Sequence, residues 1–339
     1  MSDDRTSGRP GSGGPAASGE LLRIDGLTVR LPGGRAARPL LDGVSLHVAA
    51  GETVGLVGES GSGKSVACRS VLGLLPDRAV TEGRVLVRGR DVLTAGAAEL
   101  RELRARQVAM VFQDPRAVVN PLHRIGDFLT EGLRAAGTPA AAATARAVEL
   151  LAAVGLPDPA GALRRRPHEF SGGMLQRVVI AAAMAGEPGL LLADEPTTAL
   201  DVTTQAEVIA LLTRLQRERG TGLLLVTHDL ELAAAVCDRV YVMYAGRIVE
   251  TRRTDDLFAR PRHPYTAGLI ACTPRLDPGA PPPRPVPGRP LSLAENPPGC
   301  AFAARCGHVR PRCETERPLL LPYGDGLAAC LRADEGTIP

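Results

Sequence analysis

The sequence predicts an α/β fold over residues 20–260. Along this stretch, apolar strand-like runs alternate with helical patterns, as in domains that cover a sheet with helices. One run, Gly189–Ala193, contains no polar residue, which is typical of a strand buried on both faces of a parallel sheet. A glycine-rich loop joins a strand to a helix near residue 60, which is a common device of α/β nucleotide sites.

Composition divides the rest of the chain. Residues 1–19 are rich in Ser, Gly, Pro and Asp and predict a disordered tail without a signal peptide. Within the α/β region, the Ala-rich stretch Pro139–Leu151 predicts a helical insert, and we expect a helical subdomain at about residues 114–175. The Pro-rich stretch Pro278–Pro290 predicts a linker. Residues 261–339 therefore form a C-terminal region, whose last part holds four of the seven cysteines.

Charge and hydropathy argue against two classes of protein, namely nucleic-acid-binding proteins and membrane-spanning proteins. The 339 residues carry a net charge of only +3, whereas nucleic-acid-binding domains are usually strongly basic. No apolar run reaches the roughly 18–20 residues that span a bilayer. We therefore expect a cytoplasmic protein, whose cysteines are free thiols or metal ligands rather than disulfides. Lys64 is the single lysine among 40 basic residues, and it lies in the glycine-rich loop.

This loop predicts a phosphate site. The apolar strand Thr53–Val57 leads into Gly58–Ser65, which fits GxxxxGK[ST], and a helix is expected over Val66–Leu75. Glycines let backbone N–H groups turn toward phosphates, and a helix N-terminus adds partial positive charge. We expect Lys64 to contact the β- and γ-phosphates of a nucleotide and Ser65 to bind Mg²⁺. The candidate phosphate-binding residues are Gly58, Ser60, Gly61, Gly63, Lys64 and Ser65.

Two further strand ends carry polar side chains. The run Gly189–Ala193 ends in Asp194 and Glu195. The aspartate is a candidate Mg²⁺ ligand, and the glutamate is a candidate for polarising the attacking water in phosphoryl transfer. Another predicted strand, Gly222–Thr227, ends in His228, a candidate contact to the γ-phosphate. An acidic pair alone is often only a solvated turn, and it gains meaning here beside the phosphate loop.

The segment Phe170–Arg177, with sequence FSGGMLQR, resembles the signature motif of ATP-binding cassette (ABC) proteins. The resemblance implies a P-loop NTPase (RecA-like) cassette in which Ser171, Gly172 and Gly173 face the γ-phosphate on a second subunit. It also assigns Gln113 to the Q-loop, which senses Mg²⁺ and γ-phosphate. Its further assignments are Asp194 to Mg²⁺, Glu195 to catalysis, Ala199-Leu200-Asp201 to the D-loop and His228 to the switch histidine. The sequence departs from the family at Leu31, where an aromatic residue usually stacks on adenine.

The segment His263–Leu269 is similar to that of the oligopeptide/dipeptide importer branch, whose relatives include nickel importers. This resemblance implies an ATPase subunit that energises import of di- or oligopeptides, with two permeases, a second ABC ATPase and an external binding protein. No nucleic acid is expected as a partner. It implies a peripheral position on the cytoplasmic face of the inner membrane. Residues from Gln113 to Asp127 are expected to form the groove for a permease helix.

The C-terminal cysteines predict a metal site. Cys300, Cys306, Cys313 and Cys330 could bind zinc or a [4Fe–4S] cluster, and their spacing alone leaves the choice open. The resemblance favours the cluster, because some peptide-importer ATPases carry one. His308 is expected on the surface. The other three cysteines, Cys68, Cys237 and Cys272, are expected to be small core residues.

The sequence leaves other functions to consider. One is a nickel-chelate importer ATPase of the same family, and another is a soluble ABC ATPase acting on nucleic acid or ribosomes. Proteins of the latter kind usually carry two cassettes or large insertions, whereas this chain has one cassette and a short insert. A regulatory subunit that binds ATP without turnover is disfavoured by the complete set of motifs.

Overall fold

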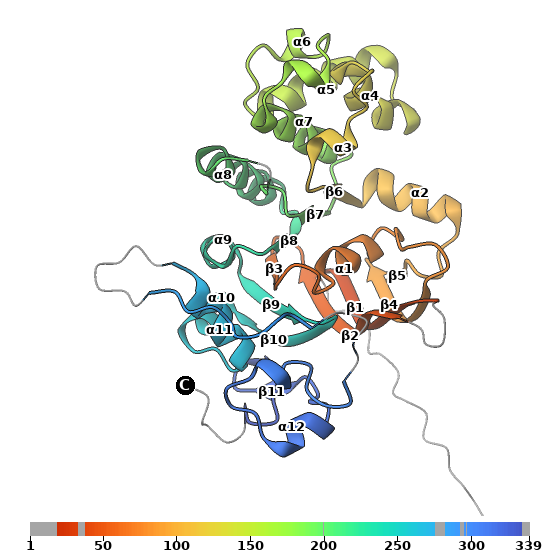
Figure 1. The fold of residues 1–339 in the computed structure, drawn as a ribbon. Helices are drawn as coiled ribbons and strands as arrows, with labels where there is room; N and C mark the ends of the chain where they lie inside the picture. Colours follow the sequence, from red (N-terminus) through yellow and green to blue (C-terminus); the bar gives the residue numbers. More distant parts are fainter. Residues whose placement is uncertain are drawn as a thin grey trace, which may run out of the picture.

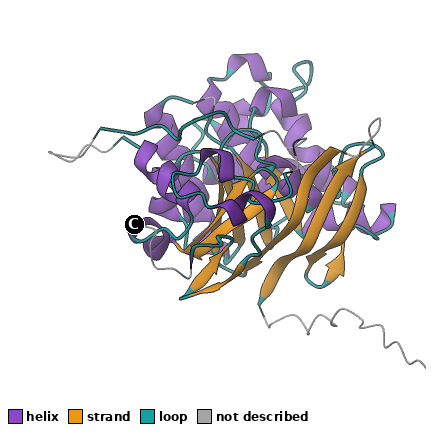
Figure 2. Cartoon of the chain, turned by 60° about the horizontal axis from the view of Figure 1, so that its bottom comes forward, coloured by secondary structure: helices purple, strands orange, loops and turns teal. Residues whose placement is uncertain are grey.

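A computed structural model describes residues 19–32, 38–198, 200–274, 282–291, 295 and 297–333. The predicted disordered tail lies outside these ranges except for Gly19. Within them, two sheets and a separate group of helices make up the molecule (Figure 1). The strands of both sheets can be followed in Figure 2.

The main sheet has eight strands in the order β11-β12-β10-β9-β3-β8-β7-β6. Strands β6, β7, β8, β3 and β9 run parallel, and β10, β12 and β11 continue the sheet antiparallel. The strands are β3 (Thr53–Val57), β6 (Val108–Val111), β7 (Leu190–Asp194), β8 (Gly222–Thr227), β9 (Arg239–Tyr244), β10 (Arg247–Arg253), β11 (Leu321–Tyr323) and β12 (Gly326–Ala328). Every residue of β3, β7 and β8 is buried, as expected for parallel strands covered on both faces.

A second, antiparallel sheet has the order β2-β1-β4-β5. Its strands are β1 (Glu20–Leu31), β2 (Arg38–Ala49), β4 (Val80–Val87) and β5 (Arg90–Asp91). Apolar side chains of this sheet, such as Leu22 and Ile24, share one buried cluster with Leu56 of β3 and Cys68 of α1 (Lys64–Ser70). The small sheet and α1 therefore cover one face of the main sheet, so that the helix after β3 is held between two sheets.

Helices pack against the other face. The cluster there joins Val57 and Leu191 of the sheet to Leu175 and Leu211 of two helices. The helices that follow α1, as far as α11, are α2 (Ala97–Arg106), α3 (Pro115–Val118), α4 (Ile125–Ala135), α5 (Ala140–Ala153), α6 (Pro159–Ala162), η1 (Pro167–Glu169), α7 (Gly172–Met184), α8 (Val202–Arg219), α9 (Leu230–Val236), α10 (Thr254–Ala259) and α11 (Pro264–Cys272). Of these, α2 contributes Leu103 to the cluster on the first face. Figure 1 shows α4, α5, α6 and α7 together at one end of the molecule, beyond α8.

The C-terminal region is tied to the main sheet. Beyond α11 it contains η2 (Ala303–Arg305), α12 (Pro311–Thr315), β11 and β12. Strand β12 pairs with β10 through Glu250 and Ala328, so this region extends the sheet that carries the phosphate loop. The sequence showed little periodicity here because these elements are only three to five residues long.

Some sequence expectations need correction. The helix after the phosphate loop begins at Lys64 and ends at Ser70, earlier than the predicted end at Leu75. Cys68 and Cys237 are buried as expected, but Cys272 is half-buried, and its Sγ lies 3.0 Å from the carbonyl oxygen of Arg284. None of the helices among the described residues is long and apolar enough to cross a membrane.

Candidate functional site

The phosphate loop begins at the buried end of β3, where the neighbouring backbone leaves no space for a side chain. Gly58 has φ of +153°, and a Cβ atom there would lie 2.2 Å from the carbonyl oxygen of Met243. Only glycine fits, because any side chain would overlap the β9 backbone. Ser60 and Gly61 are exposed at the tip of the loop, and Gly63, with φ of +105°, leads directly into α1.

Lys64 is 4% exposed, and its ammonium group is held by the loop itself. Nζ donates hydrogen bonds to the carbonyl oxygens of Gly58 (2.7 Å) and Glu59 (2.9 Å). Burial lowers the pKa of Lys64, and the negative charges of Glu195 and Asp194 oppose that shift. The cation thus lies among main-chain oxygens and near two carboxylates, without a salt bridge of its own among the described contacts.

Asp194 lies at the end of β7 and is 2% exposed. Its Oδ1 accepts a hydrogen bond from Ser65 Oγ at 2.8 Å, although the two residues are 129 positions apart. Arg69 lies 3.9 Å from the other carboxylate oxygen. Burial raises the pKa of Asp194, and the Ser65 hydrogen bond and Arg69 work against that rise. A divalent cation near Ser65 would stabilise the ionised carboxylate.

Three side chains converge on one oxygen of Glu195. Oε2 accepts hydrogen bonds from Gln113 Nε2 (3.0 Å) and Thr198 Oγ1 (2.9 Å), and it lies 3.4 Å from His228 Nδ1. Glu195 also has φ of +47°, and its N–H donates to Val226 O of the next strand at 2.9 Å. A non-glycine residue held in the left-handed region is a strained feature that occurs often at functional sites.

Sequence reasoning did not single out Thr198. It stands three residues after Glu195 in a turn, in which its N–H donates to Glu195 O at 3.3 Å. The sequence did contain a signal for it, namely a hydroxyl residue three positions after a glutamate at the end of a strand. The structure otherwise brings Gln113, Asp194, Glu195 and His228 to the carboxyl edge of the sheet beside the phosphate loop.

Ser171, Gly172 and Gly173 lie elsewhere, at the start of α7. Ser171 Oγ accepts a hydrogen bond from Met174 N at 3.3 Å and so caps the helix. A Cβ atom on Gly173 would lie 2.3 Å from Thr204 Cγ2, which shows how closely α7 approaches α8. Asp201 caps α8 by accepting from Thr204 N (3.0 Å) and Oγ1 (2.8 Å). Ala199, the first predicted D-loop residue, lies outside the described residues.

The four C-terminal cysteines line one small cavity. Cys300, Cys306, Cys313 and Cys330 surround a volume of about 20 Å³, together with His308, which is half-buried rather than on the surface. Burial raises the pKa of Cys300 to about 11 and raises those of Cys306 and Cys330. Such a volume suits about one water-sized body. In the described part of the chain, no three His, Cys, Asp or Glu side chains are grouped to hold a metal ion. The predicted iron–sulfur cluster or zinc therefore has no preformed ligand set among the described residues.

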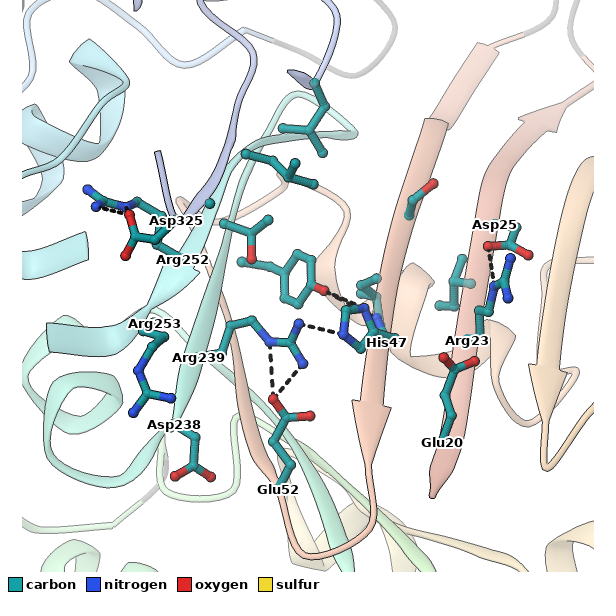
Figure 3. A pocket seen from close by; sticks show the side chains of 18 of the residues that line it. Glu20, Arg23, Asp25, His47, Glu52, Asp238, Arg239, Arg252, Arg253 and Asp325 are labelled. Carbon is teal, nitrogen blue, oxygen red and sulfur yellow. Dashed lines mark hydrogen bonds and ion pairs between the residues drawn. The ribbon is translucent and has the colours of Figure 1, made fainter. Parts of the chain in front are cut away.

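A larger cavity of about 790 Å³, lined by charged and apolar side chains, lies at the opposite, amino-terminal edge of β3 and β9 (Figure 3). Arg239 stands in it, with Nε donating to Glu52 Oε1 at 3.1 Å and Nη1 lying 2.5 Å from His47 Nε2. Tyr241 Oη lies 3.2 Å from His47 Nδ1. Its charged groups largely pair with one another, so nothing here marks a ligand.

Comparisons with known proteins agree on two segments. Residues 41–198 match the family described as ABC transporter. Residues 249–313 match the family described as oligopeptide/dipeptide transporter, C-terminal region. The second match begins inside β10 and ends at Cys313, so it covers three of the four cysteines that line the small cavity.

Similar proteins have transport functions in their names. The chain is 46% identical to a dipeptide transport ATP-binding protein of Bacillus subtilis over 279 residues, which are 81% of this chain and 83% of the relative. It is 41% identical to an oligopeptide transport ATP-binding protein of Salmonella typhimurium over 322 residues, covering 95% and 96%. A solved ATP-binding cassette, dimeric and bound to ADP and phosphate, matches with a TM-score of 0.62 and 28% identity, covering 69% of this chain and 99% of that one.

Proposed function

This chain belongs to the ATP-binding subunits of oligopeptide/dipeptide ABC transporters, and from that premise we propose that it hydrolyses ATP to drive peptide import. The observation that carries the chemistry is the meeting of three polar side chains on Glu195 Oε2, beside Lys64 and Asp194. The reaction is ATP + H₂O → ADP + phosphate. We retain residues 20–260 as the ATPase domain and 261–339 as the C-terminal region.

Glu195 acts on the attacking water. A carboxylate that accepts hydrogen bonds from Gln113 and Thr198 is held in one orientation, so that its remaining lone pairs can accept from the water. His228, whose Nδ1 lies 3.4 Å from the same oxygen, is 59% exposed on its side chain and can turn toward the γ-phosphate. Lys64 exchanges its main-chain partners for phosphate oxygens when the nucleotide enters.

Mg²⁺ would be held by Ser65, Asp194 and Gln113. Hydroxyl, carboxylate and amide oxygens are the ligands that Mg²⁺ prefers, and it keeps several waters. The Ser65–Asp194 hydrogen bond brings two of these donors together before any metal arrives. The ion supplies charge neutralisation between the phosphates, and these residues supply its position.

Ser171, Gly172 and Gly173 act on the nucleotide of a second cassette. Their start-of-helix position offers backbone N–H groups to an anion, and they pack against α8 rather than the phosphate loop. The Asp201 cap holds the start of α8 beside them. Dimerisation, with an identical or a related subunit, is thus part of the proposal.

The permease would dock between α2, β6 and α4. A groove of about 1020 Å³ lies there, and it is lined by Phe112 and Phe128, which flank the predicted docking segment Gln113–Asp127, but by no residue of that segment itself. Phe112 is the residue before Gln113, so a helix seated in the groove would move the side chain that contacts Glu195. The chain would then lie at the cytoplasmic face of the inner membrane, with the external binding protein acting indirectly.

Metal binding at the cysteine cavity is a separate proposal. Convergence of Cys300, Cys306, Cys313 and Cys330 on one cavity supports metal binding, with a [4Fe–4S] cluster ahead of zinc. The 20 Å³ volume requires the walls to move apart for a cluster to enter. Anaerobic purification followed by iron, sulfide and zinc analysis tests it. A protein with none of the three, in which all four thiols react with a thiol reagent, would refute it.

One experiment tests the transport function. The tagged chain is purified anaerobically from native membranes, and its companions are identified. We expect two permeases, a second cassette ATPase and a lipid-anchored binding protein, whose ligand identifies the cargo as a peptide or a nickel chelate. Recovery of the chain alone, or on ribosomes or DNA, would contradict the proposal while leaving the ATPase chemistry intact.

A further inference from the structure

The C-terminal region reaches into the phosphate loop through one ion pair. Arg305 of η2 has a side chain only 5% exposed, and its guanidinium binds Glu59 in the two-pronged arrangement typical of arginine and carboxylate. Nη1 lies 2.7 Å from Oε2, and Nη2 lies 2.9 Å from Oε1. Glu59 is the second residue of the loop, 246 positions earlier in the sequence.

The main chain of Glu59 is held from the same side. Its N–H donates a hydrogen bond to Tyr265 Oη at 2.9 Å, and Tyr265 is fully buried in α11. Its carbonyl oxygen accepts from Lys64 Nζ at 2.9 Å. Glu59 therefore links the C-terminal region to the lysine that is proposed to bind phosphate.

Arg305 is itself held firmly. Its Nε donates to Pro287 O at 2.8 Å, and its guanidinium lies 5.7 Å from the ring centre of Tyr244 and 5.8 Å from that of Phe302. The next residue is Cys306, which lines the cysteine cavity. The guanidinium group that binds Glu59 is thus oriented by Pro287 of the Pro-rich linker, by the rings of Tyr244 and Phe302, and by the segment that carries Cys306.

We propose that Arg305 is a positioning residue for ATP binding, which acts through Glu59 to hold the phosphate loop in its binding conformation. A loop that is already ordered loses less entropy when its N–H groups close around phosphates, so the pair strengthens nucleotide binding without touching nucleotide. The inference rests on the proposed ATPase function. It makes the region beyond residue 260 part of the nucleotide site.

A purely electrostatic role makes a different prediction. Glu59 is an anion near the place where phosphates would bind, so a variant without its charge should bind ATP more tightly if charge alone mattered. If positioning matters, Glu59→Gln should weaken binding instead. Arg305→Gln weakens binding under both ideas, so the sign of the Glu59→Gln effect separates them.

The test measures the Kd of Mg²⁺–ATPγS by calorimetry on the full-length chain, and KM and kcat for ATP in the assembled transporter. We expect Arg305→Gln and Glu59→Gln each to raise Kd and KM on the order of tenfold, and the double variant to be little worse than either. At saturating ATP, kcat should stay within about twofold, because Glu195 is unchanged. Arg289→Gln is the matched control, since Arg289 also grips a carboxylate, that of Glu295, with both Nη atoms, but on the exposed surface.

Wild-type affinity in Glu59→Gln, tighter binding in it, or additive effects in the double variant would each overturn the inference. If Arg305→Gln does not fold, as thermal melting will tell, Glu59→Gln carries the test alone, because its side chain is 23% exposed and the amide matches the carboxylate in shape. Failure of the wild-type chain to bind ATPγS would instead refute the proposed function.

Discussion

The two edges of the same parallel strands carry charged groups that are arranged in opposite ways. At the carboxyl edge, Lys64 donates hydrogen bonds to main-chain oxygens. Asp194 accepts a hydrogen bond from the Ser65 hydroxyl, and the nearest arginine nitrogen, of Arg69, lies 3.9 Å away. At the amino edge, Arg239 binds Glu52 with two nitrogens and also contacts His47. The amino-edge cavity has a volume of about 790 Å³, so the presence of a sizeable cavity does not by itself mark a nucleotide site.

The difference shows which property distinguishes a working site from a structural one. Burial lowers the pKa of Lys64 and raises that of Asp194, so the charged form of each is under-compensated until phosphate and Mg²⁺ arrive. The charges of the amino edge are compensated within the protein. Substitutions at the carboxyl edge should therefore change catalysis and binding, and those at the amino edge should change stability.

The largest effect is expected from Glu195→Gln. Loss of the carboxylate that polarises water should lower kcat by about 10²–10⁴, while ATP binding is retained because Lys64 and the loop are unchanged. Steady-state hydrolysis in the assembled transporter and nucleotide affinity are the measurements. Glu52→Gln, a glutamate of the amino edge, is the matched control. Equal losses in both variants would abolish the distinction between the edges.

Lys64→Arg should weaken ATP binding by at least about tenfold, because a planar fork does not fit the space of a compact ammonium group. Titration with Mg²⁺–ATPγS measures it. The reciprocal change, Arg239→Lys, should leave that affinity unchanged. A Lys64→Arg variant that binds like the wild type would show that the loop tolerates the larger cation.

Arg239→Gln should lower the free energy of unfolding by about 1–2 kcal/mol, since it leaves the partly buried Glu52 without its cation. Denaturant titration measures the loss. KM for ATP should not change. If KM rose together with the loss of stability, the amino edge would be coupled to the nucleotide site.

The smallest effect concerns pH. Burial, reinforced by the positive charge of Arg239, lowers the pKa of His47. The unfolded chain therefore takes up this proton at higher pH than the folded one, so stability is full above about 6.5 and falls on acidification below it. The slope from this group cannot exceed about 1.4 kcal/mol per pH unit. Melting curves of His47→Gln should show a flatter dependence between about pH 6.5, which is the usual histidine pKa, and about pH 5.

Local patterns predicted the parts of the site that lie next to strand ends. Gly58–Ser65, Asp194, Glu195 and His228 each follow an apolar run, so the carboxyl edge of a parallel sheet had to bring them together. The predicted family, α/β fold and ATPase activity are confirmed by the comparisons and the architecture. The residue roles at the site stay predictions.

The sequence did not predict the long-range contacts. Glu59 and Arg305 are 246 positions apart, and neither stands in a pattern that would pair it with the other. The presence of four cysteines predicted a shared metal site, but the sequence could not give the dimensions of the cavity, which depend on how η2 and α12 pack. Likewise, the pairing of β12 with β10 depends on three-residue strands that are too short to show alternation.

The single lysine has a practical consequence. Every other basic side chain among the lysines and arginines is an arginine, so a reagent that acylates amines meets one ε-amino group in this chain. That group is 4% exposed in the proposed nucleotide site. Acylation of Lys64 would therefore report occupancy of one defined position, with bound ATP expected to protect it. Because the chain has no other lysine, cross-linking, acetylation and isopeptide tagging have no other ε-amino group to react with.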